Sequence, residues 1–159
     1  ENSLCFVNVV FIHKQNLVVT GGVDGEVCVF DTKEGKISTT LSGHTKRITH
    51  VVAHRTRDII VSASSDKTVR VWNDGGSGYS CAHTLRHDGA VSGVALHPCG
   101  DYLLSATDSG KWNFWDVATG KGIFEAASPA QRYLSFSSPL HCTSTEVTIK
   151  CVVVRYYHH

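Results

Sequence analysis

The sequence lacks any apolar run that approaches the roughly 18 residues of a membrane-spanning helix; its longest apolar stretches, such as Val152-Val153-Val154, are short. It also lacks the basic-then-apolar pattern of a signal peptide at its start. We therefore expect no membrane partner. Methionine is absent and the first residue is Glu1, so we expect a processed chain or a piece of a longer one.

Charge is scarce and balanced. Charged residues make up 18% of the 159 residues, and 15 basic side chains against 14 acidic ones give a net charge of +1. A protein that binds nucleic acid by neutralising phosphates usually shows a basic excess or a basic stripe. Neither is visible here, so we expect no direct contact with nucleic acid.

Paired cysteines of the CxxC kind are missing, although the sequence contains six scattered cysteines, and there is no N-glycosylation sequon. We expect reduced thiols and a cytosolic or nuclear location. His50 and His54, like His83 and His87, lie four residues apart, but no third or fourth metal ligand follows at a plausible spacing. No glycine-rich phosphate loop is present either, so we expect no metal and no cofactor.

β-Branched residues are abundant. Val, Ile and Thr together account for 41 residues, about one in four, and the sequence adds 14 glycines. Stiff branched side chains favour strands over helices. The composition therefore indicates an all-β fold.

The strongest pattern is an internal repeat. The segment 20–31 recurs 42 residues later as 62–73 and 43 residues after that as 105–116. His44 and His87 are again 43 residues apart, each at the end of a similar segment. A period of about 40 residues is typical of blade-like repeat units.

Within the second unit, short apolar segments alternate with turn residues. We predict strands over 48–54, 59–64, 68–72 and 82–85, with a long glycine-rich loop over 73–78. Four short strands per unit, ending in Gly-His and Trp-Asp-like signatures, resemble a WD-repeat blade of a β-propeller. We expect about three four-stranded antiparallel blades in a ring that does not close, with repeats at about 5–43, 44–86 and 87–124.

The pattern stops near Glu125. Residues 125–159 are expected to form a non-repeat tail, either disordered or holding one stray strand over 147–154, and a degenerate fourth blade is the other interpretation. Such a tail would arise if an out-of-frame or intron-derived segment replaced the next repeat.

Recurring Ser, His, Asp and Trp residues admit two interpretations. In the structural one, His44 bridges Asp66 and a strand hydroxyl, Ser62 or Ser64, to which the Trp72 indole also donates. In the catalytic one, His44, Ser64 and Asp66 form a hydrolase triad. Equal spacing of the motif in successive units favours structure, and no G-x-S-x-G elbow is present. We expect no catalytic residue in this chain.

The other two units depart from this pattern. In the third unit His87 and Trp115 are retained, but Ser109 stands where the second unit has Asp66. In the first unit Phe30 replaces Trp72. We therefore expect a complete network only in the second unit.

Basic residues near the predicted loops are candidates for contact with a partner at one rim of the propeller. They are Lys46, Arg47, Lys67, Arg70 and Arg86. A plain solvated loop is the alternative interpretation of each.

Several segments resemble one family beyond the general WD pattern. They are 20–24, 41–49, 62–72, 100–105 and 112–117, and the aromatic-rich third repeat after Gly100-Asp101-Tyr102 is the most specific of them. Together they resemble the start of the propeller domain in the pre-mRNA-processing factors that give the NineTeen complex its name. The plant members of that family are the ones they resemble in particular. The resemblance covers about residues 7–125.

This resemblance implies a spliceosome-associated ubiquitin ligase whose propeller recruits substrates and partners. In that family a U-box binds the ubiquitin-conjugating enzyme and a coiled coil builds a tetramer, and neither is visible in this sequence. We expect protein partners, namely spliceosomal components and ubiquitination substrates. The alternatives are a WD-repeat adaptor of another complex and a truncated product without function.

Overall fold

The computed structural model describes residues 6–12 and 16–127. Within them the chain forms twelve strands in three four-stranded antiparallel sheets and no helix. The expected fold class, an all-β protein with three four-stranded blades, is confirmed. Apart from residues 125–127, the segment expected to be a tail lies outside the described residues.

Each sheet consists of four strands that follow one another in the chain. The first sheet holds β1 (Phe6–Ile12), β2 (Leu17–Gly22), β3 (Val27–Asp31) and β4 (Lys36–Leu41). The second holds β5 (Ile48–Ala53), β6 (Ile59–Ser64), β7 (Thr68–Asp74) and β8 (Tyr79–Arg86). The third holds β9 (Val91–Leu96), β10 (Tyr102–Thr107), β11 (Lys111–Asp116) and β12 (Gly122–Ala127).

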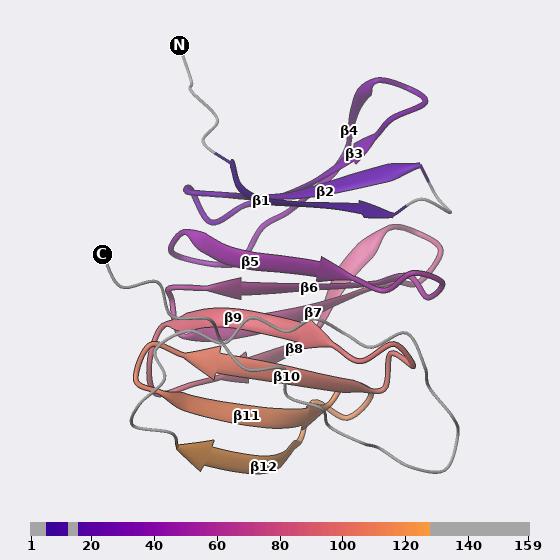
Figure 1. Ribbon diagram of the computed structural model, residues 1–159. Coiled ribbons are helices and arrows are strands. Elements are labelled where there is room, and N and C mark those ends of the chain that lie inside the picture. The colour runs from indigo at the N-terminus through magenta and orange to yellow at the C-terminus, as the bar shows by residue number, and fades with distance from the viewer. Residues whose placement is uncertain (1–5, 13–15, 128–159) are drawn as a thin grey trace.

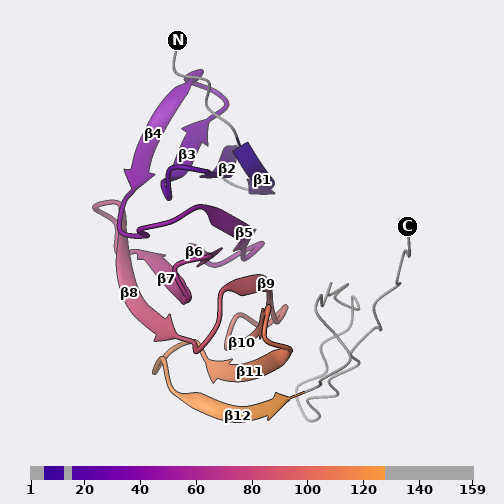
Figure 2. The ribbon, with the colours of Figure 1, turned by 90° about the vertical axis from the view of Figure 1, so that its left-hand side faces the viewer.

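The three sheets stack face to face like blades (Figure 1). The first strands of the three sheets, β1, β5 and β9, lie beside one another on one side of the stack, and β4, β8 and β12 form the opposite, outer side (Figure 2). The sheets fan out around the line of first strands. In the described part of the chain this arc stays open and does not close into a ring.

Two apolar layers hold the stack together. Between the first and second sheets, Val19, Val29, Ile48, Ile60 and Trp72 belong to one buried cluster. The second cluster lies between the second and third sheets; it includes Val61, Val69, Val71, Val91 and Leu103.

Strand β6 shows how the sequence produces this packing. Its neighbours along the chain point to opposite faces of the sheet, so Ile60 enters the first cluster and Val61 the second. Because both faces are covered, five of its six residues are buried. The outer strand β8 is mostly exposed and keeps an inward apolar residue, Leu85.

The hairpin between β7 and β8 differs from the prediction. The strands extend to Asp74 and start again at Tyr79, which pair with each other, so the loop is shorter than expected. The Asp74 carboxylate accepts the backbone N–H groups of Gly76 at 2.7 Å and Gly78 at 3.1 Å. This side-chain turn, with positive φ angles of 92° and 113° at those two glycines, reverses the chain tightly.

The two outermost sheets also present apolar side chains to solvent. Val9 on the first sheet is 50% exposed, and Ile123 and Phe124 on the third are 52% and 55% exposed. Over the described ranges, the structure contains no helix long and apolar enough to cross a membrane.

Candidate functional site

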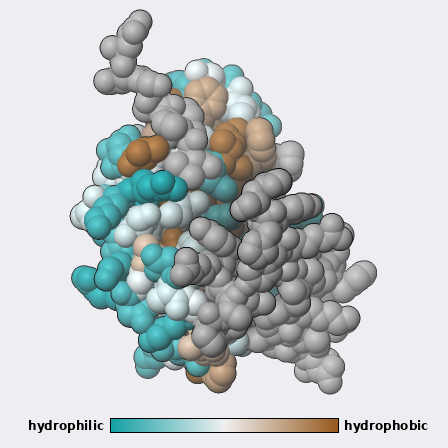
Figure 3. Space-filling model, turned by 60° about the vertical axis from the view of Figure 1, so that its left-hand side comes forward, coloured by the Kyte–Doolittle hydropathy of each residue, from teal (hydrophilic) through white to brown (hydrophobic). Residues whose placement is uncertain are grey.

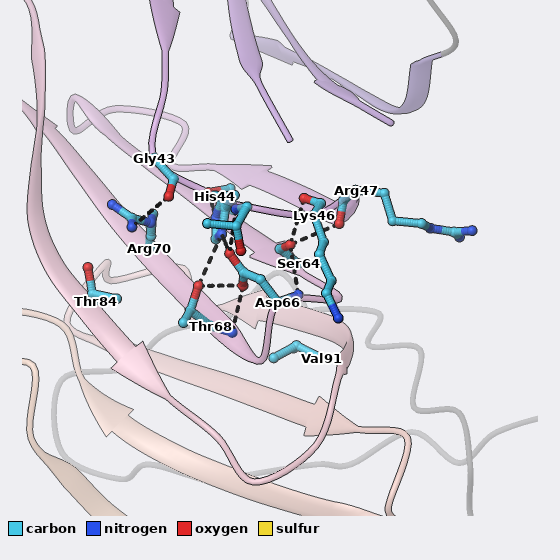
Figure 4. Close-up of polar contacts among 12 residues, drawn as sticks. Gly43, His44, Lys46, Arg47, Ser64, Asp66, Thr68, Arg70, Thr84 and Val91 are labelled. Atoms are coloured by element: carbon cyan, nitrogen blue, oxygen red, sulfur yellow. Dashed lines mark hydrogen bonds and ion pairs between the residues drawn. The ribbon is translucent and has the colours of Figure 1, made fainter. Parts of the chain in front are cut away.

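A chain of hydrogen bonds runs through the second blade. The Nε1–H of Trp72, on β7, donates to the hydroxyl of Ser62, on β6, over 2.9 Å. His44, in the loop that precedes β5, has Nε2 at 2.9 Å from the same hydroxyl and Nδ1 at 2.9 Å from Oδ2 of Asp66. Asp66 lies in the turn between β6 and β7, so the chain ties an incoming loop to a turn inside the blade (Figure 4).

The turn that carries Asp66 is shaped by its own side chains. Oδ1 of Asp66 accepts the backbone N–H of Thr68 at 2.9 Å and its hydroxyl at 2.6 Å. Lys67 between them adopts a φ of 71°, an uncommon left-handed conformation for a residue with a side chain. The carboxylate therefore stabilises the tight turn and also orients the His44 ring.

Ser64 pins the incoming loop from a second point. Its hydroxyl lies 2.9 Å from the carbonyl oxygens of both Lys46 and Arg47 and accepts the backbone N–H of Asp66 at 3.1 Å. The loop and the turn are thus joined by main-chain contacts as well as by the imidazole. This arrangement fixes the backbone of the loop before β5.

Burial favours the neutral form of the His44 ring. Removal from water is the largest influence and lowers the pKa of His44, although the Asp66 carboxylate opposes this. A neutral ring with its hydrogen on Nδ1 donates to Asp66 and accepts the Ser62 hydroxyl at Nε2, so every polar atom of the chain is satisfied. Burial opposes the charged carboxylate of Asp66, but hydrogen bonds from Thr68, His44 and the Thr45 backbone outweigh it and lower the pKa of Asp66.

Ser62, His44 and Asp66 have the connectivity of a hydrolase triad but not its access. Ser62 is 0% exposed, and its oxygen already accepts the Trp72 indole N–H. A nucleophile must reach its substrate, and this hydroxyl lies inside the blade. The triad considered from the sequence used Ser64 as its serine. The Ser64 hydroxyl donates to the carbonyl oxygens of Lys46 and Arg47 and does not contact His44.

The third blade carries a shorter version of the chain. Trp115 Nε1 donates to the Ser105 hydroxyl at 2.8 Å, and His87 Nε2 lies 2.7 Å from that hydroxyl. Nδ1 of His87 lies 3.2 Å from the carbonyl oxygen of Leu85, which replaces a carboxylate. Ser109 contacts the Thr107 hydroxyl at 2.8 Å. Burial again lowers the pKa of the histidine, here His87.

Among the described residues of the first blade, no such chain forms at the corresponding strand. Phe30 lies on β3 where the second blade has Trp72 on β7. A phenyl ring has no N–H to donate, so Phe30 cannot make the hydrogen bond that the Trp72 indole makes to a strand hydroxyl in the second blade.

Four of the five basic candidates lie at one edge of the second sheet. Lys46 and Arg47 are in the β4–β5 loop, Lys67 in the β6–β7 turn and Arg86 at the end of β8, and all four are exposed. Figure 4 shows the Arg47 side chain extending away from the hydrogen-bonded network.

Arg70 is placed differently. It lies on β7, half-buried, and its Nη2 donates to the carbonyl oxygen of Gly43 over 2.8 Å. Its guanidinium carbon lies 5.8 Å from the centre of the Trp72 ring, a cation–π contact. These contacts hold Arg70 against its own blade.

Sequence reasoning missed two members of the networks. Thr68 donates to Asp66, and Ser105 is the central hydroxyl of the third blade. The signal for Ser105 was present, because it lies 43 residues after Ser62. Thr68 gave none, since threonine is common in strands.

Three of the four histidines considered as metal ligands have other partners, and those of His87 are given above. His54 Nε2 lies 2.8 Å from the carbonyl oxygen of Pro98, and His83 Nε2 lies 2.9 Å from that of Ala118. Among the residues that the structure describes, no three His, Cys, Asp or Glu side chains come together in a group able to hold a metal ion.

Comparison with known proteins gives matches of two kinds. The family model "WD domain, G-beta repeat" matches residues 35–73 and 79–116. Among solved structures, a chain in the crystal structure of a mitotic checkpoint complex superposes with a TM-score of 0.70 at 20% identity. That match covers 79% of this chain and 38% of the other, and at this identity it establishes the shared propeller fold alone.

Two similar curated proteins are pre-mRNA-processing factors. Pre-mRNA-processing factor 19 of Bos taurus is 45% identical over 107 residues, which are 67% of this chain and 21% of that protein. Pre-mRNA-processing factor 19 homolog 2 of Arabidopsis thaliana is 37% identical over 122 residues, 76% of this chain and 23% of that protein. The chain therefore spans about a fifth to a quarter of the length of the curated relatives it matches.

Proposed function

Because the chain is a WD-repeat segment of the pre-mRNA-processing factor 19 family, we propose that it acts as a protein-interaction scaffold that recruits partners and substrates to a spliceosome-associated ubiquitin ligase. The partners are spliceosomal components of the NineTeen complex and ubiquitination substrates, and the place of action is the nucleus. The U-box chemistry and the coiled-coil tetramer of the family belong to other parts of such a protein.

The observation that supports this proposal is the rigid edge of the second blade. His44, Ser64 and Asp66 fix the loop before β5 and the turn after β6, while the side chains of Lys46, Arg47, Lys67 and Arg86 remain exposed. A fixed backbone that presents free side chains binds a partner with little loss of conformational entropy. The exposed side chains of this edge are suited to binding a partner, and the buried polar residues behind them stabilise the fold.

The rest of the proposed organisation follows from the repeats. We propose that residues 5–43, 44–86 and 87–124 are the three repeat units, the last of them lengthened by β12, which runs on to Ala127, and that the rest of the segment 125–159 lies outside them. Each unit except the first begins with the histidine-bearing loop that its own blade then binds, as His44 and His87 do.

Affinity purification of the full-length protein from nuclear extract tests the proposal. Variants Lys46→Ala, Arg47→Ala, Lys67→Ala and Arg86→Ala are each compared with Lys33→Ala and Arg55→Ala, two exposed cations at the opposite edge of the sheets. We expect loss of spliceosomal proteins from at least one of the first four variants and unchanged recovery with the two controls. Equal recovery from all six contradicts a recruiting role for this edge.

A further inference from the structure

The exposed cations of the second blade are distributed across its whole width. Arg47 precedes the innermost strand β5, Lys67 lies between β6 and β7, and Arg86 ends the outermost strand β8. Lys46 lies beside Arg47 in the same loop. This edge is on the left in Figure 1, and Figure 3, which brings it toward the viewer, shows hydrophilic residues over much of the coloured surface.

In the part of the chain that the structure describes, no carboxylate pairs with these cations. Within the described residues, Lys46, Arg47 and Arg86 form no ion pair, and the Lys67 Nζ donates to a carbonyl oxygen, that of Asp88, at 3.0 Å. By contrast, Lys111 pairs with Asp88 at 2.7 Å.

The carboxylates of the same blade edge already have partners. Asp66 is bound to His44 and Thr68, and Asp88 to Lys111. Burial leaves Asp66 only 6% of its side-chain surface exposed. The second blade therefore presents more positive than negative charge to a ligand at this edge.

The neighbouring blades set the direction in which a ligand can lie. At the same edge, the β2–β3 turn of the first blade carries Asp24 and Glu26, and the β10–β11 turn of the third carries Asp108. An acidic ligand that ran along the rim would approach these carboxylates and be repelled. One that crossed the second blade from β5 to β8 would meet the cations of that blade and, beyond Arg86, a single exposed carboxylate, that of Asp88, which Lys111 already pairs.

The spacing fits an extended chain. Neighbouring strands lie about 4.8 Å apart, so the ends of β5 and β8 are separated by roughly 14 Å, the length of four to five extended residues at about 3.3 Å each. Alternate side chains of such a segment point to the same side. Acidic residues at every second position would therefore face the successive cations.

We propose that this edge of the second blade binds an extended, carboxylate-rich segment of a partner protein, which lies across the blade from Arg47 to Arg86. The proposal rests on the recruiting function proposed above and specifies the chemistry of the recruited segment. The hydrogen bonds of the Ser64 hydroxyl with the Lys46 carbonyl oxygen and the Asp66 backbone N–H fix the backbone of the loop that carries the cations before the ligand binds.

Fluorescence anisotropy with the full-length protein tests the proposal. The probe is a labelled ten-residue peptide of alternating Glu and Ser, and its control is the same peptide with Gln in place of Glu. We expect binding of the Glu peptide only, weakened several-fold between 50 and 300 mM salt, because the Debye length that screens exposed charges falls from about 14 Å to about 6 Å over this range.

Charge reversal locates the site. Arg47→Glu/Arg86→Glu is expected to weaken binding by about tenfold or more, since two attractions become repulsions, while the matched double variant Lys33→Glu/Arg55→Glu at the opposite edge stays within about twofold. Circular dichroism confirms that each double variant is folded. Equal binding of the Gln peptide, equal loss in both double variants, or no binding of the Glu peptide overturns the proposal.

The two proposals fail separately. If the alanine variants at this edge lose spliceosomal proteins but the Glu peptide does not bind, recruitment stands and the acidic chemistry is wrong. If the Glu peptide binds but no protein from the extract depends on this edge for its recovery, the surface binds acidic peptides and the proposed recruiting function is wrong.

Discussion

His54 and Pro98 join two blades. The His54 ring accepts the backbone N–H groups of Arg57 at 2.9 Å and Thr56 at 3.2 Å with Nδ1, so its hydrogen is on Nε2, which donates to the carbonyl oxygen of Pro98 at 2.8 Å. The same two loops also carry the Arg57–Asp101 ion pair, at 2.6 Å. A buried hydrogen bond and an exposed ion pair thus bridge the same gap between blades.

Replacing His54 should cost more than breaking the ion pair. His54→Phe leaves two backbone donors and the Pro98 carbonyl without their partner, and we expect a loss of about 2 kcal/mol in the free energy of unfolding. Arg57→Ala removes an ion pair whose side chains are 49% and 54% exposed, worth below about 1 kcal/mol. Urea unfolding followed by tryptophan fluorescence measures both, and equal losses would contradict this ranking.

Ser62→Ala tests the hydroxyl at the centre of the second blade. The change leaves the Trp72 indole N–H and the His44 Nε2 buried without a partner. We expect a destabilisation of about 2–3 kcal/mol. The control is Ser80→Ala, at an exposed position on β8, which should stay within about 0.5 kcal/mol. A loss no larger than that of Ser80→Ala would show that the hydrogen-bonded chain contributes nothing to stability.

The buried histidines should make stability depend on pH. The folded-state pKa of His44 and that of His87 are both lowered from 6.5 by burial, so the unfolded chain binds protons in a range where the folded chain does not. Their contribution is present above pH 6.5 and is lost as the pH falls from there toward the folded pKa values. His50 acts in the same direction.

Urea unfolding at pH 7.5, 6.5 and 5.5 measures this dependence. We expect the free energy of unfolding to decrease steadily over that series and to decrease less in the variant His87→Gln, which cannot titrate. Asp66 adds a second loss at lower pH: its folded pKa lies below 3.8, so its contribution disappears as the pH falls below that value. A flat profile between pH 7.5 and 5.5 would contradict the burial argument.

Gly21 marks a close approach between the first two blades. A Cβ built at this position would collide with Cγ2 of Ile48 and lie 3.0 Å from a methyl of Val51. Gly21→Ala should therefore overpack the interface and destabilise the protein by about 1–3 kcal/mol. Gly75→Ala, where no atom lies within 4 Å of the added methyl, is the matched control for thermal unfolding. Equal melting temperatures of the two variants would contradict the close approach.

The period of the sequence was enough to predict the blades but not their loops. The 42- to 43-residue repeat and the alternation of apolar residues placed all four strands of the second unit. The start of β8 was placed at 82 instead of Tyr79, because glycines signal a loop whatever its length. Only the Asp74 side chain, which caps the turn, determines that the loop is short.

The site was predictable in kind and ambiguous in detail. Ser62 and Ser64 are two residues apart on one strand and so share a face, which is why periodicity alone could not choose between them. Which serine joins the network depends on which hydroxyl both the Trp72 indole and the His44 ring can reach. The packing of the strands against one another determines that. The repeat pattern marks His54, which recurs 43 residues later as His97, but it does not show that the His54 ring reaches Pro98 of the next blade.

The hydrogen-bonded chain of the second blade joins residues that are near one another in sequence. Its bonds span 10, 18 and 22 positions, from Trp72 back to Ser62, from Ser62 to His44 and from Asp66 to His44. Short loops close quickly and at small entropic cost. During synthesis, the second and third blades can therefore each form these bonds once their own third strand has left the ribosome, before the following part of the chain is made. The polar interior of each of these two blades thus depends on no residue of the blade that follows it.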